Sequence, residues 1–424
     1  MKKLNEVPPT LNPSPARGEG IVNQKTGSNT KNNSQKKTDI RQCGVNLNRW
    51  WPVAHIDNMS KSKLRGTRIG NLELLAVKQK NGEYAVFEDA CPHKRVRLST
   101  MGQVKNDQIQ CQYHGWRFAS NTGECTSLDA MPGQENRFNL KPFPSQVYAG
   151  WVWAFPGDSA LADQTRLPHI PPANNVEGYY RIPMEGTVNC HYSFITENAT
   201  DLFHAELHQA QQPWANPRLV SLEETHSQIL ARYQVDTPNP LARLFTGNKK
   251  EKFIIIRYDY PYIHIYEEGG GFYLFVTYIP THTNQTSVFS TFFFPHILPW
   301  STVTKLLLPI VEPILLSILN QGTFRKVFQE DIQAVEEEQR AYALHEQDLS
   351  RDTNPVTHAV RRVLIKQSTE FSPTLNPVPT DILIRNLSRE TAGESPEGVA
   401  GTSTLDNLKP NCNMACHKEV RHAV

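Results

Sequence analysis

Cys91-Pro92-His93 is followed, after 17 residues, by Cys111-Gln112-Tyr113-His114-Gly115-Trp116. Each of these two motifs supplies one cysteine and one histidine. A [2Fe–2S] cluster with two thiolates on one iron and two imidazoles on the other needs two loops that each deliver one residue of either type. The spacing therefore predicts two paired hairpin loops that present these four side chains to one cluster.

Tetrahedral zinc is the simplest alternative, because two cysteines and two histidines also satisfy that metal. Zinc fingers, however, typically separate the cysteine pair from the histidine pair, whereas each motif here contains both residue types. Gly115-Trp116 also follows the second histidine directly. The pattern favours an iron–sulfur cluster over zinc.

The two motifs resemble the Rieske domain of ring-hydroxylating and related oxygenases, whose usual pattern is C-P-H-R-x-x-P-L-S, then C-x-Y-H-G-W-x-F. The resemblance implies four cluster ligands: Cys91, His93, Cys111 and His114. Lys94 and Arg97 stand where arginine and proline are common in the family. These two substitutions leave the ligands intact, but they alter the rigidity of the first loop and the charge around the cluster.

A second candidate site lies in the stretch from Glu197 to His208, which reads Glu-Asn-Ala-Thr-Asp-Leu-Phe-His-Ala-Glu-Leu-His. We expect a helix around His191 to Gln212. Residues four apart share one face of an α-helix, so His204 and His208 can both point at one metal. Two incidental histidines on a surface helix are the commoner explanation of such a pair, but the preceding iron–sulfur motifs favour iron here.

The third ligand of such a site should be a carboxylate from a later helix. The predicted helix Thr323 to His345 has an apolar stripe formed by Phe324, Val327, Phe328, Ile332 and Val335. Asp331 lies on the same line, and a carboxylate among core-facing residues is unfavourable unless it is paired or bound to a metal. Asp331 is therefore predicted as the third ligand, whereas Glu330 is interpreted as a solvated residue beside Lys326.

The histidine stretch resembles the N-x-x-D-x-x-H-x-x-x-x-H motif of Rieske oxygenases, with three residues between the histidines where four are usual. The carboxylate ligand of the family often follows an acidic residue, as in Glu330-Asp331. The resemblance implies that Asp201 links His204 to a Rieske histidine of the neighbouring subunit, which requires a ring-shaped homotrimer. It also implies that Asn198 lies close to the iron without being a firm ligand.

Length and composition predict two domains between two tails. Residues 1–46 and 389–424 are poor in large apolar side chains and are expected to be disordered. Short β-runs over residues 47–157 predict an all-β Rieske domain. A change to helices and longer strands predicts a catalytic domain over residues 158–388, so the fold class is α+β. The resemblance implies that this second domain is a helix-grip fold, with an antiparallel sheet and long helices.

Individual β-runs and helices are predicted within these domains. In the first domain the runs are Leu72–Val77, Tyr84–Glu88, Gln108–Cys111, Arg117–Ala119 and Val147–Ala154. In the second domain the β-runs are Phe253–Tyr266, Gly271–Tyr278 and Thr286–Phe294, and a further helix is expected at Thr302–Leu319.

The charge and hydropathy of the chain exclude several partners. Lys plus Arg (44) nearly balances Asp plus Glu (42), and the net charge of +2 offers no general attraction for nucleic acid. The apolar stretch Leu306 to Leu319 is shorter than the roughly 20 residues needed to span a bilayer. Residues 1–44 lack the apolar core of a secretion signal, so a cytoplasmic location is expected.

The resemblance implies a reaction class. A Rieske oxygenase uses dioxygen and externally supplied electrons to oxygenate an organic substrate at a mononuclear iron. The chain has no G-x-G-x-x-G fingerprint, so we expect a separate ferredoxin or NAD(P)H-dependent reductase. Its similarity to pheophorbide a oxygenase and aromatic demethylases favours hydroxylation or demethylation of a bulky apolar or aromatic compound.

Two other functions remain open from the sequence. A ring-dihydroxylating α-subunit has the same motifs. An electron carrier or redox sensor would keep the Rieske domain and use the second domain only to bind a ligand. Cys412 and Cys416 near the C-terminus form a further candidate redox or metal site.

Overall fold

The computed structural model describes residues 39–60, 62–128, 132–174, 179–208, 214–237, 251–295 and 325–370. The predicted helix at residues 302–319, the cysteines Cys412 and Cys416, and both predicted tails except residues 39–46 lie outside these ranges.

Three small antiparallel sheets occupy the N-terminal half. The first has the order β1-β11-β10 and consists of β1 (Trp51–His55), β10 (Ser145–Tyr148) and β11 (Trp151–Ala154). The second has the order β2-β3-β4-β9 and consists of β2 (Leu64–Ile69), β3 (Leu72–Lys78), β4 (Tyr84–Glu88) and β9 (Pro142–Phe143). The third has the order β5-β6-β7-β8 and consists of β5 (Gly102–Lys105), β6 (Gln108–Cys111), β7 (Arg117–Ala119) and β8 (Cys125–Ser127). The short helix α1 (Leu98–Met101) precedes β5.

Several predicted β-runs coincide with strands of this half. The runs at β4, β6 and β7 match at both ends. The predicted run Val147–Ala154 is instead a hairpin, because Ala149 and Gly150 have positive φ angles of 55° and 85° and form a turn between β10 and β11. Positive φ at both central residues is the geometry of a tight hairpin turn, and only the glycine was a visible signal for it.

A seven-stranded antiparallel sheet forms the C-terminal half, in the order β12-β18-β17-β16-β15-β14-β13. Its strands are β12 (Tyr179–Val188), β13 (Ala215–Glu224), β14 (Gln228–Asp236), β15 (Glu251–Asp259), β16 (Tyr262–Glu267), β17 (Tyr273–His282) and β18 (Gln285–Pro295). The predicted run Phe253–Tyr266 is thus two strands, β15 and β16, which meet at a two-residue turn. In the described ranges, the α-helices with this sheet are α2 (Tyr192–Thr200), α5 (Arg325–His345) and α6 (Pro355–Glu370).

The chain also forms short 3-10 helices in its connections. Those within the described part of the chain are Ile40–Gln42, Ile56–Met59, Glu135–Arg137, Ser159–Leu161, Pro171–Asn174 and Leu202–Leu207. Small β-sheets followed by a large antiparallel sheet with helices on one face confirm the predicted α+β class.

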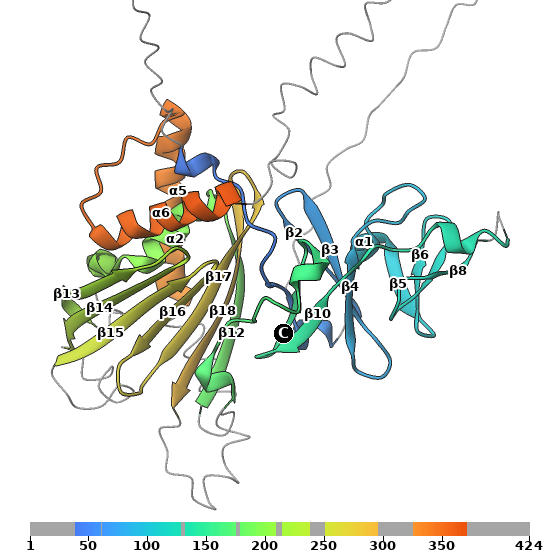
Figure 1. Cartoon of the computed structure of the whole chain (residues 1–424), viewed down its shortest axis with the longest axis horizontal. Coiled ribbons are helices and arrows are strands. Elements are labelled where there is room, and N and C mark those ends of the chain that lie inside the picture. Colours follow the sequence, from blue (N-terminus) through green and yellow to red (C-terminus); the bar gives the residue numbers. More distant parts are fainter. Residues whose placement is uncertain are drawn as a thin grey trace, which may run out of the picture.

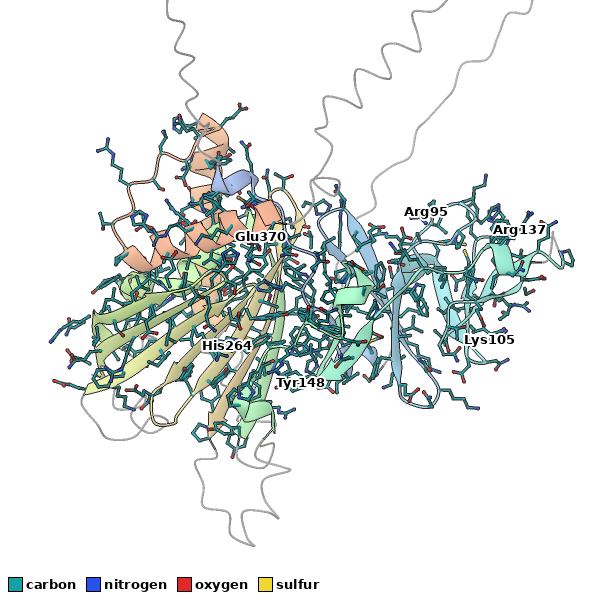
Figure 2. All side chains as sticks on the ribbon, in the orientation of Figure 1. Arg95, Lys105, Arg137, Tyr148, His264 and Glu370 are labelled. Atoms are coloured by element: carbon teal, nitrogen blue, oxygen red, sulfur yellow. The ribbon has the colours of Figure 1, made fainter. Side chains whose placement is uncertain are left out.

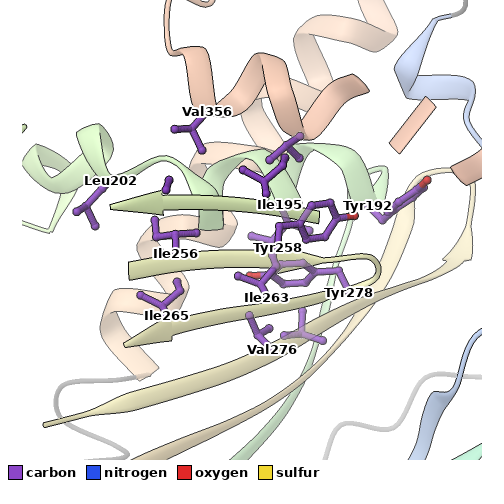
Figure 3. Packing of buried hydrophobic residues seen from close by; sticks show 14 of the residues in the cluster. Tyr192, Ile195, Leu202, Ile256, Tyr258, Ile263, Ile265, Val276, Tyr278 and Val356 are labelled. Atoms are coloured by element: carbon purple, nitrogen blue, oxygen red, sulfur yellow. The ribbon is translucent and has the colours of Figure 1, made fainter. Parts of the chain in front are cut away.

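The two faces of the large sheet are buried against different partners. Side chains alternate along a strand, so Ile263 of β16 packs on one face and Tyr262 on the other. On the first face, Figure 3 shows Ile195 of α2 and Val356 of α6 above the apolar side chains of β15, β16 and β17. On the second face, the ring centroid of Tyr262 lies 6.0 Å from that of Trp153 in β11. The N-terminal half is therefore held to the back of the sheet by an aromatic core.

The prediction that the N-terminal tail extends to residue 46 is wrong at its C-terminal end. Ile40 and Cys43 belong to the core of the large sheet, and the Arg41 side chain is completely buried. The Arg41 guanidinium lies 2.5 Å from Glu197 in α2 and 3.1 Å from Asp348. The polar composition of this stretch suggested a tail. Its polar side chains are buried because they pair with residues far away in the sequence, and composition does not reveal such pairs.

Candidate metal centres

The first cysteine–histidine motif forms a closed loop between β4 and α1. The Cys91 amide donates to the Val96 carbonyl over 2.9 Å, and the Arg95 amide donates to the Cys91 carbonyl over 2.8 Å. Arg95 has a φ of 58°, which turns the chain back toward Cys91. Just outside the loop, the buried Asp89 carboxylate accepts hydrogen bonds from the amide and hydroxyl of Ser99, which holds the two ends of the loop together.

The second motif repeats this loop between β6 and β7. The Cys111 amide donates to the Trp116 carbonyl over 2.8 Å, and the Gly115 amide donates to the Cys111 carbonyl over 2.9 Å. Gly115 has a φ of 76° and occupies the position of Arg95 in the first loop. A positive φ is easily adopted by glycine. The two motifs are therefore two copies of one backbone arrangement, as their mixed Cys/His content predicted.

The four predicted cluster residues lie together at the tips of these loops. The ring centroids of His93 and His114 are 4.3 Å apart, and His93 stacks on Trp116 at 4.7 Å. Burial, together with the neighbouring Cys111 thiol, raises the pKa of the Cys91 thiol to about 11. Two adjacent buried thiols and two adjacent imidazoles form the donor set of a Rieske cluster.

An unpaired nitrogen supports this fit. The His93 Nδ1 atom is buried and has no hydrogen-bond partner within the described part of the chain. A buried polar atom without a partner is unfavourable unless it binds something that the protein atoms do not supply. A cluster iron would satisfy it. His114, in contrast, is exposed, so one edge of the site faces solvent.

The second candidate site brings together His204, His208 and Asp331. One ligand atom from each residue can be chosen so that all three lie within 4.8 Å of one another. The Asp331 Oδ1 atom lies 3.3 Å from His208 Nε2 and 3.5 Å from His204 Nε2. Donors bound about 2.1 Å from one ion at right angles are separated by about 3 Å, so the arrangement fits one face of a two-histidine, one-carboxylate site.

The histidines do not lie on one α-helix, and that prediction is wrong. Helix α2 ends at Thr200, Asp201 is extended with φ −96° and ψ 103°, and a separate 3-10 helix covers Leu202–Leu207. The break occurs because the Asp201 Oδ1 atom accepts the Phe203 amide over 2.8 Å and so caps the start of the 3-10 helix. His208 follows the end of that helix.

Asp331 and Glu330 lie side by side in the second turn of α5. The Asp331 side chain is 17% exposed, as expected for a carboxylate that faces the site. Glu330 was interpreted as solvated, and the structure corrects this: its Oε2 atom lies 3.0 Å from His208 Nδ1. Although burial disfavours the charged imidazole, Asp331 and Glu330 together raise the pKa of His208 above its ordinary value.

The two remaining predicted residues are placed just before the first histidine of the site, and the Asp201 carboxylate interacts electrostatically with His204. Asp201 is half-buried, and its Oδ1 atom accepts the side-chain amide of Asn354 over 2.8 Å. Burial raises the pKa of its carboxyl group. Asn198 lies in α2, where its carbonyl accepts the Asp201 amide over 3.1 Å. The group of three potential metal ligands that the described residues form does not include Asp201.

Two residues beside the site were missed from the sequence. Asn354 precedes Pro355 at the start of α6, a helix that was not predicted, although asparagine followed by proline is a recognisable signal for a helix start. That signal could have located the cap but not its bond to Asp201. Glu330 was visible as half of an acidic pair, but no local pattern links it to a histidine 122 positions earlier.

Comparisons with known proteins agree with this geometry. A family model for the Rieske [2Fe–2S] domain matches residues 49–144. The 4beta-methylsterol monooxygenase of Methylococcus capsulatus is 27% identical over 343 residues, which cover 78% of this chain and 91% of that protein. The oxygenase component of Dicamba O-demethylase from Stenotrophomonas maltophilia is 32% identical over 208 residues, covering 47% of this chain and 59% of that protein.

Solved structures share the fold. The crystal structure of dicamba monooxygenase bound to dicamba matches with a TM-score of 0.60 and 23% identity, and the match covers 77% of this chain and 99% of that one. The paired loops and their family match define a Rieske iron–sulfur protein. With the second site and the relatives added, the chain is a Rieske-type non-haem iron oxygenase, a class whose cofactors are a [2Fe–2S] cluster and a mononuclear iron.

The chemistry of this class divides between the two cofactors. When bound, the cluster supplies single electrons, and the mononuclear iron supplies open coordination positions for dioxygen. The protein contributes the placement of the donors.

Proposed function

We propose that this chain is the oxygenase component of a multi-component system that hydroxylates or demethylates a bulky, uncharged apolar or aromatic compound. Electrons come from a separate ferredoxin or NAD(P)H-dependent reductase. The observation that carries the proposal is the convergence of His204, His208 and Asp331. Asp331 belongs to α5, whose apolar side chains pack in the core on one face of the large sheet. The names of the relatives, which are monooxygenases and O-demethylase components, support the same reaction class.

We assign the ligands as follows. Cys91 and Cys111 bind one iron of the cluster, and His93 and His114 bind the other. The mononuclear iron is held by three further residues: His204, His208 and Asp331. Their proximity and the unpaired nitrogen of His93 support this assignment.

The chemistry of the sheet face supports an uncharged substrate. Partly buried apolar side chains from the sheet and from α5 pack against the core on this face, among them Met184, Leu274, Phe292, Phe328 and Ile332. By strand alternation Lys252 and Glu267 also face this side, but they pair with each other at 2.8 Å and so neutralise each other. A substrate carboxylate would find no unpaired cation among these residues. A relative that covers 78% of this chain carries the name of a 4beta-methylsterol monooxygenase, which agrees with this chemistry.

Electron transfer is proposed to occur between neighbouring chains of a homotrimer. Arg95 of the first cluster loop lies at one end of the molecule, whereas α5 and α2, which flank the mononuclear site, lie at the other (Figures 1 and 2). Fast transfer therefore requires the cluster of one chain to approach the iron of another. Asp201, next to the His204 helix, is the proposed bridge to His93 or His114 of the next chain. The mass of the assembly in solution, measured by light scattering, tests the trimer.

The decisive experiment for the function is metal counting followed by turnover. Anaerobically purified protein should contain about three irons and about two acid-labile sulfides per chain, and a His204→Ala variant should lose about one iron while keeping the Rieske EPR signal. With a surrogate reductase, a neutral methylated polycycle should give a hydroxylated product or formaldehyde. Two irons, two sulfides and an unchanged variant would establish an electron carrier instead.

None of the helices in the described residues has the length and apolar content required to cross a membrane. We propose that the protein is located in the cytoplasm, and cell fractionation tests this location.

A further inference from the structure

His208 is held at both ring nitrogens by one turn of α5. Its Nε2 atom lies 3.3 Å from Asp331 Oδ1, and its Nδ1 atom lies 3.0 Å from Glu330 Oε2. The imidazole is only 3% exposed, so this ring has little freedom to rotate. Consecutive residues on a helix point about 100° apart. The ring therefore spans two neighbouring side chains of α5 and takes its orientation from both.

Glu330 also decides which nitrogen can bind a metal. A carboxylate next to Nδ1 requires a proton on that nitrogen, which leaves the lone pair on Nε2 free. Nε2 is the atom that points toward Asp331 and His204. A negatively charged acceptor behind an imidazole also makes the other nitrogen a stronger donor to a metal.

His204 has no corresponding partner among the residues that the structure describes. Its side chain is 26% exposed, and its Nδ1 atom is without a hydrogen-bond partner in the described ranges. Asp201, the carboxylate three residues earlier, uses its Oδ1 atom to accept the Phe203 amide and the Asn354 side chain. The two histidines are thus held differently: one is oriented from within the chain and the other is not.

The helix that carries Glu330 is itself fixed. The Gln339 Oε1 atom accepts the His191 amide over 2.8 Å, and Glu336 accepts the Asn189 amide over 2.9 Å. These contacts attach α5 to the segment that leads into α2. Glu330 and Asp331 therefore move together with a helix that is anchored beyond the site.

We infer that Glu330 is a positioning residue that orients His208 and strengthens its bond to the mononuclear metal, an inference that rests on the metal site proposed above. Glu330 does not touch the metal or the substrate. Removing such an outer carboxylate typically lowers metal affinity by about 10- to 100-fold. Because the first cluster loop, which carries Arg95, lies at the opposite end of the molecule from α5, substitution of Glu330 should leave the Rieske cluster unaffected.

The test uses the full-length protein, with the mononuclear metal removed by a chelator and the cluster retained. Co(II) is then titrated into wild type, Glu330→Ala, Glu330→Gln and Glu337→Ala, and the dissociation constant is read from the visible absorption of the bound ion. Glu337 is the matched control, since it is an exposed carboxylate on α5 that pairs only with Arg340 among the described residues. Rieske EPR and sulfide content report whether each variant is folded.

We expect Glu330→Ala to weaken Co(II) binding by about 10- to 100-fold, with an altered absorption spectrum, and Glu337→Ala to match wild type. Glu330→Gln keeps an acceptor for Nδ1 but loses the charge, so it should lie between the two. Equal affinity and spectra for wild type and both Glu330 variants overturn the inference alone. If wild type binds no Co(II) at all, the proposed metal site is refuted, and the inference that rests on it is refuted as well. If Glu330→Ala does not fold, the Glu330→Gln titration decides.

Discussion

Asn354 donates its side-chain amide to the Asp201 Oδ1 atom over 2.8 Å and thereby ties the start of α6 to the residue that follows the last turn of α2. The same Asn354 side chain accepts the Val356 amide over 3.0 Å, so one residue caps α6 and restrains the proposed bridge between the metal centres. Asp201 in turn starts the 3-10 helix that carries His204. The direction of the Asp201 carboxylate is therefore determined by the packing of α6 as well as by the 3-10 helix that follows Asp201.

Replacing Asn354 by Asp separates these two roles. Aspartate caps a helix as well as asparagine, but it replaces the donor to Asp201 with a second carboxylate. We expect Asn354→Asp to destabilise the protein by about 1–3 kcal/mol in urea unfolding and to slow reduction of the mononuclear iron in single-turnover experiments. Asn121→Asp, a change at an exposed turn, is the control. Unchanged electron transfer in Asn354→Asp would argue against a role of this contact.

Arg41 should be essential for stability although it belongs to a stretch of tail-like composition. Its side chain is completely buried, contacts Glu197 and Asp348, and lies 3.7 Å above the ring centroid of Phe194. Removing one partner of a buried ion pair typically costs about 3–5 kcal/mol. Glu197 retains Arg361, so we expect about 3 kcal/mol for Arg41→Met in denaturant unfolding. The matched change Arg340→Met, at an exposed pair, should stay within about 0.5 kcal/mol. Equal effects of both substitutions would contradict the core position of Arg41.

Gly66 should tolerate no side chain because of the Asp89–Ser99 contact that closes the first cluster loop. A Cβ atom at Gly66 would lie 2.5 Å from Ser99 Oγ and 2.9 Å from Asp89 Oδ2. We expect Gly66→Ala to destabilise the Rieske half by about 1–3 kcal/mol and to lower the sulfide content per chain. The mononuclear site should still bind Co(II), since it lies in the other half of the chain. Full sulfide content in Gly66→Ala would mean that the loop does not depend on this contact.

His191 makes stability depend on pH. Burial lowers its pKa from 6.5 to about 4, so the folded state resists its protonation. Between pH 6.5 and 4 the unfolded chain binds this proton and the folded chain does not, so the free energy of unfolding falls as the pH falls through that window. The full difference is about 3 kcal/mol. It is absent above pH 6.5, where both states are neutral.

His191→Asn tests this origin of the pH dependence. His191 caps α2 by accepting the Ser193 amide, and asparagine can also accept that bond but does not titrate. Urea unfolding at pH 7.5 and pH 5 should therefore show a smaller difference for the variant than for wild type. An identical pH dependence in the two proteins would assign the effect to other groups.

The fold and the sites were predictable to different degrees. The fold class and the strands β4, β6 and β7 followed from short-range residue patterns, because alternation and turn residues act over a few positions. The breaks at Ala149-Gly150 and at Asp201 were not predicted. A non-glycine residue with positive φ and an aspartate that ends one helix to begin another both depend on contacts that compete with local propensity.

By itself, the sequence determined the Rieske motifs and the chemical class, because iron–sulfur clusters accept few residue types and their spacing is local. It also placed three potential metal ligands on the chain, from residue type and neighbourhood alone. Only the tertiary structure decided that Glu330 meets His208, that Asn354 meets Asp201 and that Arg41 is buried. The pairs Glu330–His208, Asn354–Asp201 and Arg41–Glu197 each join residues more than 100 positions apart. Which side chains meet depends on the rotation of a packed helix, and local spacing does not encode that rotation.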